Sequence, residues 1–463
     1  MTSKKRIYLN AFEMNTVVHQ APGLWKFPGD QAYQYNTVEY WVNLAKLLEK
    51  GLFDGMFIAD VIGIYDLYKN GKETTLKTAT QVPVNDPILL VSAMAHATEH
   101  LGFGITASTT FENPYTFARR MSTADHLSKG RVAWNVVTSY LESGTKNIEI
   151  GDKFKHDERY NIAEEYMHVV YKLWEGSWED DAVVRDIEKG VFTDPDKVHD
   201  IAHEGKYFTV PGIHLCEPSP QRTPVIYQAG SSSKGIEFAA KHAECTFISI
   251  PTKTPAAKYV KSLRSEVEKQ GRDPQSVKVL ALATIITGET DEIAQAKYEQ
   301  FLSYIDLEGA LSLLSGWLGV DFSQFDPDEE LTYFETNALQ GIIASLTDAD
   351  NEQKWTPRKL AEFVGIGGLG PIFVGAAQKV ADQMEDWIAE TDVDGFNLAY
   401  ITTPGTFEDI VTYVVPELQK RGLYKTSYAE GTLREKLALN DSASVHVQHP
   451  AYRYKKLKQS LQL

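Results

Sequence analysis

The feature that most constrains this chain is a repeated alternation of short apolar runs, rich in β-branched residues, with longer segments of helical period. Such alternation predicts a parallel sheet, because two parallel strands need a crossover connection that is usually a helix. Eight strand–helix units close a (β/α)₈ barrel, the TIM-barrel fold. The strands are expected at residues 6–12, 53–60, 101–109, 131–139, 224–230, 245–251, 277–288 and 395–402.

The intervening segments carry apolar residues at helical spacing. Between the first two strands, Trp41, Leu44, Ala45 and Leu48 fall at i, i+3, i+4 and i+7 and mark one buried face. An open, doubly wound sheet is the rival architecture, but it normally uses fewer strands and divides into two domains. No Pro-, Gly- or Ser-rich linker marks such a division, so we expect a single domain over residues 1–463. Helices are expected at 37–51, 89–98, 115–127, 160–175, 234–242, 256–271, 292–304 and 407–421.

Three segments do not follow the strand–helix pattern. A stretch of mixed character covers about 176–222, and a polar, glycine-containing stretch covers about 306–392. The second is the larger and lies between the expected strands seven and eight. Both are expected to be insertions, and long insertions near a barrel mouth are natural lids over an active site. The polar C-terminal extension, about 427–463, is expected to wrap the surface.

The charge and cysteine content limit the partners and the compartment. A net charge of −17 repels phosphate backbones and anionic lipid, so neither nucleic acid nor a membrane surface is an expected partner. Two cysteines cannot build a disulfide framework, which suits a reducing compartment. No signal-peptide segment and no run of about 18 apolar residues occurs. The expected location is therefore the cytoplasm.

The expected strand ends carry hydroxyl, amide and a few carboxyl groups. In a barrel of this kind the active site lies at the C-terminal ends of the strands, which places Asp60, Thr106 and Asn135 at its mouth. These groups suit a polar, planar, phosphorylated cofactor, although Asp60 could instead simply cap the next loop. The strand ends lack the several converging His and carboxylate ligands that metal-assisted hydrolysis needs, so no metal site is expected.

The turn at 228–235 is a second candidate binding element. It combines a strand end, a run of small residues that includes Ser231 and Ser232, and the start of a helix. Backbone N–H groups at a helix start, together with serine hydroxyls, can hold a phosphate. A plain turn capped by serine is the alternative. His156 and Tyr160 begin another expected helix, where they face either the barrel mouth or solvent.

Several of these segments, taken in order, resemble the bacterial-luciferase-like flavin-dependent monooxygenases. The chain is similar to the branch containing nitrilotriacetate monooxygenase component A, dibenzothiophene-sulfone monooxygenase and pristinamycin synthase, and most of all to long-chain alkane monooxygenases. The resemblance covers nearly the whole chain. It is carried by residues 10–15, 57–60, 134–139, 156–160, 228–232 and 421–424, and, for the alkane-oxidising members, by 173–178 and 215–222.

The resemblance implies a cofactor, a partner and a reaction. The cofactor would be FMN, used as FMNH₂ supplied by a separate NAD(P)H:flavin reductase, with O₂ as co-substrate. One oxygen atom would enter a small, largely apolar substrate through a C4a-(hydro)peroxyflavin, and the enzyme would be a homodimer or homotetramer. By position, Asp60, Thr106 and Asn135 would contact the isoalloxazine, His156, Tyr160, Ser231 and Ser232 the ribityl phosphate, and His19, Tyr65 and Gln81 would lie over the reactive face.

The substrate side departs from the alkane-oxidising pattern. That pattern has Cys where Thr16 stands, His where Tyr140 stands, and a further His within the segment 311–317. The substrate could therefore be alkane-like or contain sulfur or nitrogen. A deazaflavin- or flavin-dependent dehydrogenase of the same superfamily remains an alternative. A metal-dependent barrel hydrolase and a non-catalytic flavin-binding protein are alternatives from other classes.

Overall fold

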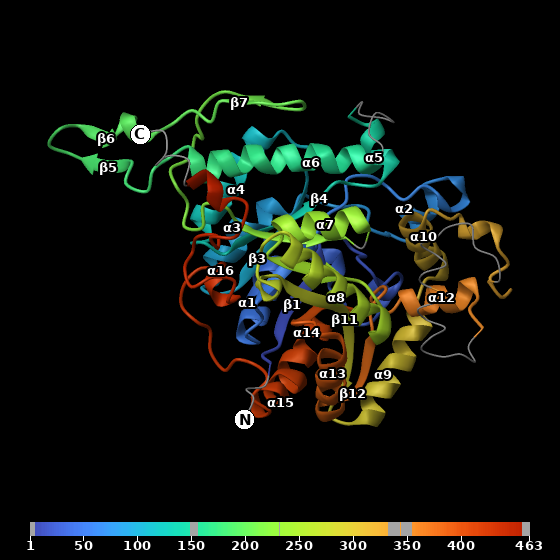
Figure 1. Cartoon of the computed structure of the whole chain (residues 1–463). Helices are drawn as coiled ribbons and strands as arrows, with labels where there is room; N and C mark the ends of the chain where they lie inside the picture. The colour runs from blue at the N-terminus through green and yellow to red at the C-terminus, as the bar shows by residue number, and fades with distance from the viewer. Residues whose placement is uncertain (1–4, 149–155, 231, 332–342, 344–353, 456–463) are drawn as a thin grey trace.

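The computed structural model describes residues 5–148, 156–230, 232–331, 343 and 354–455, and its centre is a closed barrel of eight parallel strands (Figure 1). Each strand pairs with its neighbours in chain order, and the pairing of β1 with β13 completes the ring. The expected (β/α)₈ barrel is thus confirmed. Its strands are β1 (Tyr8–Met14), β2 (Gly55–Ala59), β3 (Gly102–Ser108), β4 (Val132–Val137), β9 (Val225–Ala229), β10 (Cys245–Ile248), β11 (Lys278–Gly288) and β13 (Gly395–Ala399).

Helices surround this barrel and pack their apolar faces on it. In α1, Trp41, Leu44 and Leu48 are buried as the helical spacing predicts. The final helical segment is interrupted by a π-helical stretch, Ile410–Val414, between α14 and α15. The helices of the ring are α1 (Val38–Lys50), α3 (Ile88–His96), α4 (Pro114–Leu127), α6 (His156–Tyr171), α7 (Ser233–His242), α8 (Lys253–Lys269), α13 (Ala377–Thr391), α14 (Gly405–Asp409) and α15 (Val415–Lys420).

The segment between β11 and β13 contributes a helix to the ring around the barrel and a strand beside it, which its polar composition does not indicate. Helix α9 (Asp291–Tyr304) packs on β11 and on β12 (Ile372–Ala376), a ninth parallel strand that pairs with the end of β11 outside the barrel. Helix α13 then packs against α8 and α15, so it takes the ring position between them. Helices α10 (Leu307–Leu318) and α12 (Pro357–Val364) pack on each other to one side of the barrel, at the right of Figure 1.

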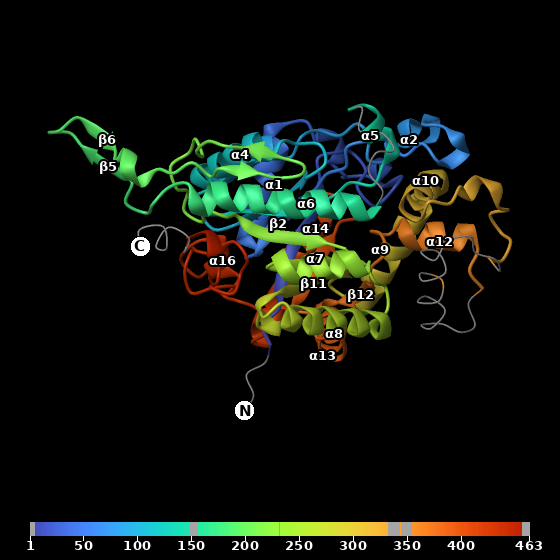
Figure 2. The ribbon, with the colours of Figure 1, turned by 45° about the horizontal axis from the view of Figure 1, so that its top comes forward.

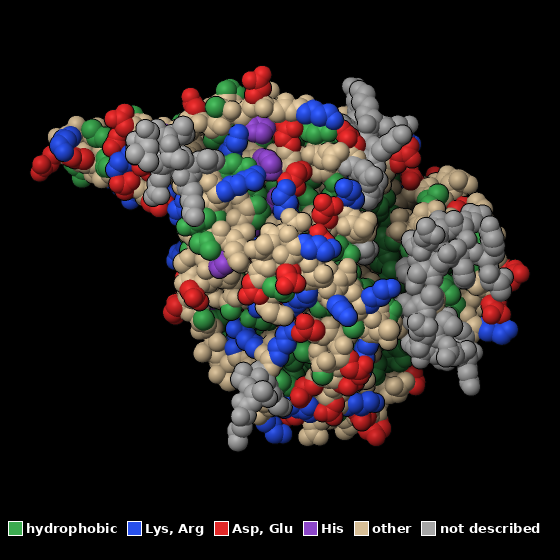
Figure 3. All heavy atoms as spheres, in the orientation of Figure 1, with side chains coloured by type: hydrophobic (Ala, Val, Ile, Leu, Met, Phe, Trp, Pro, Cys, Tyr) green, Lys and Arg blue, Asp and Glu red, His purple; other side chains and the backbone are tan. Residues whose placement is uncertain are grey.

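The segment between β4 and β9 forms two small antiparallel hairpins. One consists of β5 (Val183–Asp186) and β6 (Val191–Thr193), and it projects away from the body at the upper left of Figure 2. The other consists of β7 (His203–Glu204) and β8 (Thr209–Val210). In the space-filling view, acidic and basic side chains are mixed over the visible face (Figure 3). No helix within the described ranges is long and apolar enough to cross a membrane.

The C-terminal extension closes the N-terminal end of the barrel, which is the end where the strands begin. Its helix α16 (Leu433–Lys436) buries Leu433, and the following Leu437 and Leu439 join the same apolar cluster as the inward-facing barrel residues. The Leu433 N–H donates to the Gly130 carbonyl, just before β4. The expectation that the tail only wraps the surface is wrong for this part. Leu433, Leu437 and Leu439 lie in a polar segment, and they fill the open N-terminal end of the barrel.

Candidate functional site

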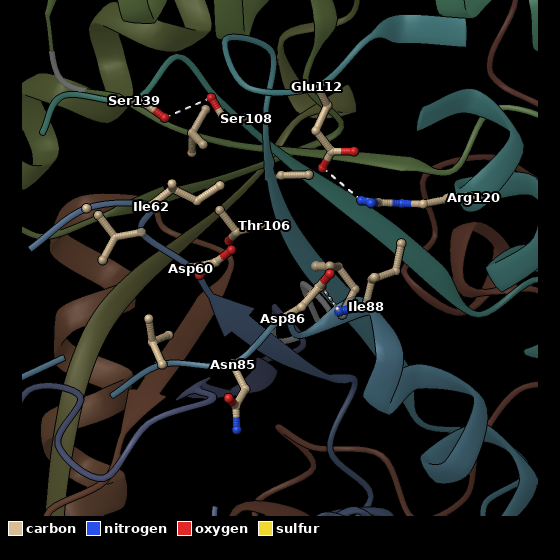
Figure 4. A pocket seen from close by; sticks show the side chains of 16 residues that line it. Asp60, Ile62, Asn85, Asp86, Ile88, Thr106, Ser108, Glu112, Arg120 and Ser139 are labelled. Atoms are coloured by element: carbon tan, nitrogen blue, oxygen red, sulfur yellow. Dashed lines mark hydrogen bonds and ion pairs between the residues drawn. The ribbon is translucent and has the colours of Figure 1, made fainter. Parts of the chain in front are cut away.

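A cavity of about 300 Å³ lies at the C-terminal ends of β2, β3 and β4 (Figure 4). Asp60 follows β2 directly, Thr106 belongs to β3, and Ser139 follows β4. Parallel strands end at the same edge of the sheet, and this brings residues far apart in sequence to one mouth. The lining residues are Asp60, Val61, Ile62, Gly63, Val84, Asn85, Asp86, Ile88, Ile105, Thr106, Ala107, Ser108, Glu112, Arg120, Val137 and Ser139.

Thr106 and Asn135 form a polar pair beneath this mouth. They are partners in the register of β3 and β4, and the Asn135 Nδ2 donates to Thr106 Oγ1 at 3.0 Å. Both side chains are buried, and Asn135 Oδ1 has no hydrogen-bond partner among the described residues. A buried carbonyl oxygen without a donor is costly, so this atom suits the N–H group of a ligand.

Asp60 is the residue of the mouth whose charge is most perturbed. Burial, together with the smaller effects of the negative charges of Asp86 and Glu112, raises the pKa of Asp60 from 3.8 to about 7, against the opposing hydrogen bond from the Val61 N–H. Its side chain points toward Thr106 in Figure 4. Near neutral pH the carboxyl group can therefore either donate or accept a hydrogen bond.

The remaining charges at the cavity are mostly negative. Arg120 Nη2 forms an ion pair with Glu112 Oε1 at 2.8 Å, and Asp86 Oδ1 accepts the Ile88 N–H at 3.0 Å near the start of α3. The lining thus has three carboxyl groups and a single guanidinium group. No three His, Cys, Asp or Glu side chains in the described part of the chain lie so that they could hold a metal ion.

The start of α7 forms a second group of polar residues, called the second polar station. It comes directly after β9, the strand that pairs with β4. Ser232 Oγ accepts the Gly235 N–H at 3.0 Å and caps the helix. Tyr160 comes from α6, and its hydroxyl lies 3.1 Å from where a Cβ at Gly235 would be, so glycine permits this close approach. The structure brings Tyr160 and Ser232 together at a helix start, which favours anions. Ser231 and the side chain of His156 lie outside the described residues.

His19, Tyr65 and Gln81, which come from separate loops, form one connected hydrogen-bonded chain. Gln81 Nε2 donates to the His19 carbonyl at 2.8 Å, and Tyr65 Oη donates to Gln81 Oε1 at 3.1 Å. Tyr65 also meets the Tyr140 hydroxyl at 2.6 Å and the Trp317 Nε1 at 3.2 Å. Burial raises the pKa of Tyr65, so its phenol is neutral.

The imidazole of His19 is buried and uncharged. Burial lowers the pKa of His19 to about 3, against a smaller opposite effect of its hydrogen bond to the Phe12 backbone. The ring packs edge-on against the Phe12 ring, with the two centroids 4.4 Å apart. At neutral pH this side chain cannot act as a cationic acid, and its contribution to the chain of hydrogen bonds is its backbone carbonyl.

Sequence reasoning did not assign Tyr140 and Trp317 to the site. Tyr140 was visible only as a departure from a known pattern, although it comes three residues after β4, close to a strand end. Trp317 lies in α10, 252 residues beyond Tyr65, and no periodicity connects the two positions. Only packing of the insertion against the loop after β2 brings them together.

Comparison with known proteins identifies a family whose model matches this chain. The model of a family described as luciferase-like monooxygenase matches residues 23–395. The dimethyl-sulfide monooxygenase of Hyphomicrobium sulfonivorans is 54% identical, with 98% of this chain and 94% of the relative covered. The crystal structure of DmoA from that organism matches with a TM-score of 0.93 over 97% of this chain and 96% of the other.

Two further proteins are similar over the full length. The long-chain alkane monooxygenase of Geobacillus thermodenitrificans is 50% identical, with 99% of this chain and 100% of the relative covered. The crystal structure of long-chain alkane monooxygenase matches with a TM-score of 0.90, covering 98% and 100% of the two chains. A riboflavin lyase solved with a modified FMN matches at 34% identity and a TM-score of 0.87, covering 97% and 100%.

The family model spans most of the chain, and the two curated relatives cover nearly all of it at half identity or more. The structural matches extend over the barrel and its insertions alike. The chain is therefore an enzyme of the flavin-dependent monooxygenase type, and it belongs to the luciferase-like monooxygenase family.

Proposed function

We propose that this enzyme is the oxygenase of a two-component system that uses reduced FMN and O₂ to transfer one oxygen atom to a small, largely apolar organic substrate. The observation that carries the proposal is the placing of two polar stations on neighbouring strands. The cavity over β2, β3 and β4 is one station, and the Tyr160–Ser232 station at the start of α7 follows β9, which pairs with β4.

The residues at the two stations fit FMN. Asp60, Thr106 and the unpartnered Asn135 Oδ1 would hydrogen-bond the polar edge of the isoalloxazine. Tyr160 and Ser232 would hold the phosphate at the helix start, where backbone N–H groups favour an anion. Ser231 and His156 are proposed for the same end on the family resemblance alone. When bound, reduced flavin supplies the two electrons that let one atom of O₂ enter the substrate while the other leaves as water.

The protein's own contribution would be to position the ring and to exclude water. Aliphatic side chains form much of the cavity wall, and an apolar wall keeps competing water away from the reacting atoms. His19 is neutral, so it would orient groups through its backbone carbonyl without proton transfer from its ring. The aliphatic lining residues are Val61, Ile62, Val84, Ile88, Ile105, Ala107 and Val137.

A separate NAD(P)H:flavin reductase would supply the reduced cofactor, and the oxygenase would act as a homodimer or homotetramer. A cavity of about 300 Å³ is at the small end of ligand sites, which favours one flavin ring over a flavin and a nicotinamide together. The two relatives with 54% and 50% identity are named for dimethyl sulfide and long-chain alkanes, both apolar molecules. This supports an apolar substrate here.

The test is an anaerobic titration of the purified protein with photoreduced FMN, followed by O₂ and a candidate substrate. We expect tight binding, and we expect oxygenated product only when reduced FMN is present. A Tyr160→Phe, Ser232→Ala double variant should weaken binding by about 1–4 kcal/mol, because two charge-assisted hydrogen bonds are lost. Tyr298→Phe, on α9 and away from both stations, is the matched control. Unchanged affinity in the double variant would disprove the phosphate assignment, and turnover with a deazaflavin alone would replace the function.

A further inference from the structure

The hairpin of β5 and β6, called the arm below, carries apolar side chains into solvent. It projects from the body of the molecule, and within the described chain no other helix or strand packs on it to the extent that its two strands pack on each other (Figure 2). Ile187, at its turn, is 94% exposed, and Phe192 is 63% exposed. An isolated two-stranded hairpin is only marginally stable in water, so we expect the arm to pack on a further surface.

Contacts at the root of the arm place it beside α4. In the segment that leads into the arm, Trp174 donates from Nε1 to the Ala118 carbonyl of α4 at 3.1 Å. Arg185 on β5 forms an ion pair with Glu217 at 3.4 Å, and the Glu217 carbonyl lies 3.1 Å from His126 Nε2, which is also on α4. The root of the arm is therefore attached to the body, and its turn is free.

A groove of about 490 Å³ runs between α3 and α4 on the outside of the barrel. Two of its lining side chains are strongly exposed leucines, Leu89 of α3 at 74% and Leu127 of α4 at 59%. Ile88 and Arg120 line both this groove and the cavity at the barrel mouth. A partner that fills the groove would therefore cover apolar surface and border the proposed cofactor site.

The groove and the arm carry complementary charges. The groove lining has two arginines and no carboxylate, and Arg119 is exposed without an ion-pair partner in the described part of the chain. Residues 179–197, which include the arm, have seven acidic and three basic side chains. Glu188 follows Ile187 in the turn, is exposed, and forms no ion pair with any described residue. These opposite charges favour contact between the two surfaces.

A second copy of this chain can supply both surfaces at once. The arm lies on the α4 side of the molecule, as both views of the ribbon show (Figures 1 and 2). A twofold axis beside α3 and α4 would bring the arm of each copy over the groove of the other, so the contact would occur twice. Because a net charge of −17 repels two copies at long range, the apolar contact and the local charge pair would have to hold them together.

We propose that the arm of one copy docks in the α3–α4 groove of a second copy and that this contact, made twice, forms a homodimer. In the contact, Ile187 packs between Leu89 and Leu127, and Glu188 pairs with Arg119. The proposal rests on the homo-oligomeric part of the proposed function, and it adds the surface and the residues that join the copies. A tetramer would consist of two such dimers joined through another surface.

The first experiment measures the mass of the purified enzyme over a range of protein concentrations by sedimentation equilibrium. Ile187→Asp on the arm and Leu89→Asp in the groove each place a charge in the apolar contact, and both positions are exposed, so the core is not disturbed. We expect the Kd for separation of the copies to rise at least about tenfold in each variant. Ile293→Asp, 43% exposed on α9, is the control and should keep the wild-type value.

A wild type that is monomeric at every concentration would overturn the proposal. So would an unchanged Kd in both variants, and that result would leave the groove to a different partner such as the flavin reductase.

The second experiment exchanges the two charges. Glu188→Arg and Arg119→Glu should each weaken the association by about 3- to 10-fold, because each variant brings like charges together. Both changes in one chain restore an opposite pair, so the double variant should recover most of the wild-type affinity. A double variant as weak as the two losses combined would overturn the pairing.

The third experiment needs neither flavin nor turnover. Ile187→Cys and Thr123→Cys, which lies on α4 between Arg119 and Leu127, are combined in a Cys216→Ser background and treated with a short bismaleimide. We expect a crosslinked product of twice the chain mass, and no such product from either cysteine alone. A link within one chain would overturn the proposal, because the arm would then close on its own groove. The crosslinked dimer in a protein that does not bind reduced FMN would support the interface while the proposed oxygenase function fails.

Discussion

At the scale of single residues, Asp60 shows how burial gives a common side chain an uncommon property. It stands at the end of a buried strand, near Asp86 and Glu112, and its half-buried carboxyl group keeps its proton up to about pH 7. The surrounding fold stabilises the neutral form, and this makes the charge of the residue sensitive to pH near neutrality.

Replacing Asp60 by Asn should change the pH dependence of stability. The folded-state pKa of about 7 lies above the ordinary value of 3.8, so the folded protein binds this proton more tightly than the unfolded chain. The contribution of Asp60 to stability is therefore complete below about pH 4 and is lost as pH rises through 7. Asp60→Asn stays neutral, so its stability relative to the wild type should increase between pH 5 and pH 8.

Thermal denaturation of both proteins at pH 5 and pH 8 measures this difference. Glu299→Gln, on an exposed face of α9, is a control that should show the same difference at both pH values. A constant gap between Asp60→Asn and the wild type would contradict a raised pKa in the folded state.

The parts of the site that sequence could predict are those tied to strand ends. Asp60 ends an apolar run, and Thr106 and Asn135 lie near the ends of theirs. A parallel barrel collects strand ends at one mouth, so their convergence follows from the pattern. Tyr140 and Trp317 could not be placed in this way. Their meeting depends on how an insertion folds back on a loop, and no local period encodes that contact.

At the scale of elements, helix α16 is attached to the barrel by a buried ion pair. Arg434 is fully buried, and its Nε and Nη2 contact the two carboxylate oxygens of Glu244 at 2.7 and 2.9 Å. The same Nη2 donates to the Thr223 carbonyl at 2.9 Å. Glu244 and Thr223 come just before β10 and β9, so this one side chain links the C-terminal extension to the starts of two strands.

Replacing Arg434 by Met should destabilise the protein by about 3–5 kcal/mol, because the charge of Glu244 would stay buried without its partner. The Arg434→Met, Glu244→Gln double variant should recover part of this loss. Urea unfolding followed by circular dichroism measures both changes. FMN affinity should stay the same in every variant that folds, because the ion pair lies at the end of the barrel opposite to the proposed cofactor site. A single variant as stable as the wild type would contradict the assigned role.

The fold shows the same division between local pattern and tertiary contact. The eight barrel strands could be predicted from composition and period, since a strand buried on both faces is apolar along its length. The ring position of α13 and the pairing of β12 with β11 could not, because they depend on tertiary contacts, those of α13 with α8 and of β12 with β11. The tail was expected to be superficial because its average polarity hides the three leucines that enter the barrel.

At the scale of the whole molecule, the overall charge and the proposed cofactor site have opposite effects on an approaching phosphate group. The chain carries a net charge of −17, whereas the start of α7 favours a phosphate through its N–H groups. A phosphate group carries about −1.5 to −2 at neutral pH. If reduced FMN binds at the proposed site, it would therefore be repelled at long range and attracted only close to that site.

This conflict predicts an unusual effect of salt on cofactor binding. The screening length falls from about 30 Å at 0.01 M salt to about 8 Å at 0.15 M, so salt removes the long-range repulsion while leaving short contacts almost intact. We expect the association rate of reduced FMN to rise by roughly 2- to 10-fold over this range. Dissociation should change little, because it would depend on the short contacts proposed at Tyr160 and Ser232.

Anaerobic stopped-flow mixing at several NaCl concentrations measures both rates. Uncharged reduced riboflavin is the matched control ligand, since it keeps the isoalloxazine and lacks the phosphate, and its association rate should not depend on salt. An association rate for reduced FMN that falls with salt would contradict the prediction, because it would mean that the mouth attracts the phosphate at long range. In that case the charges around the rim would outweigh the net charge of the molecule, and the acidic surface would have no part in how the cofactor arrives.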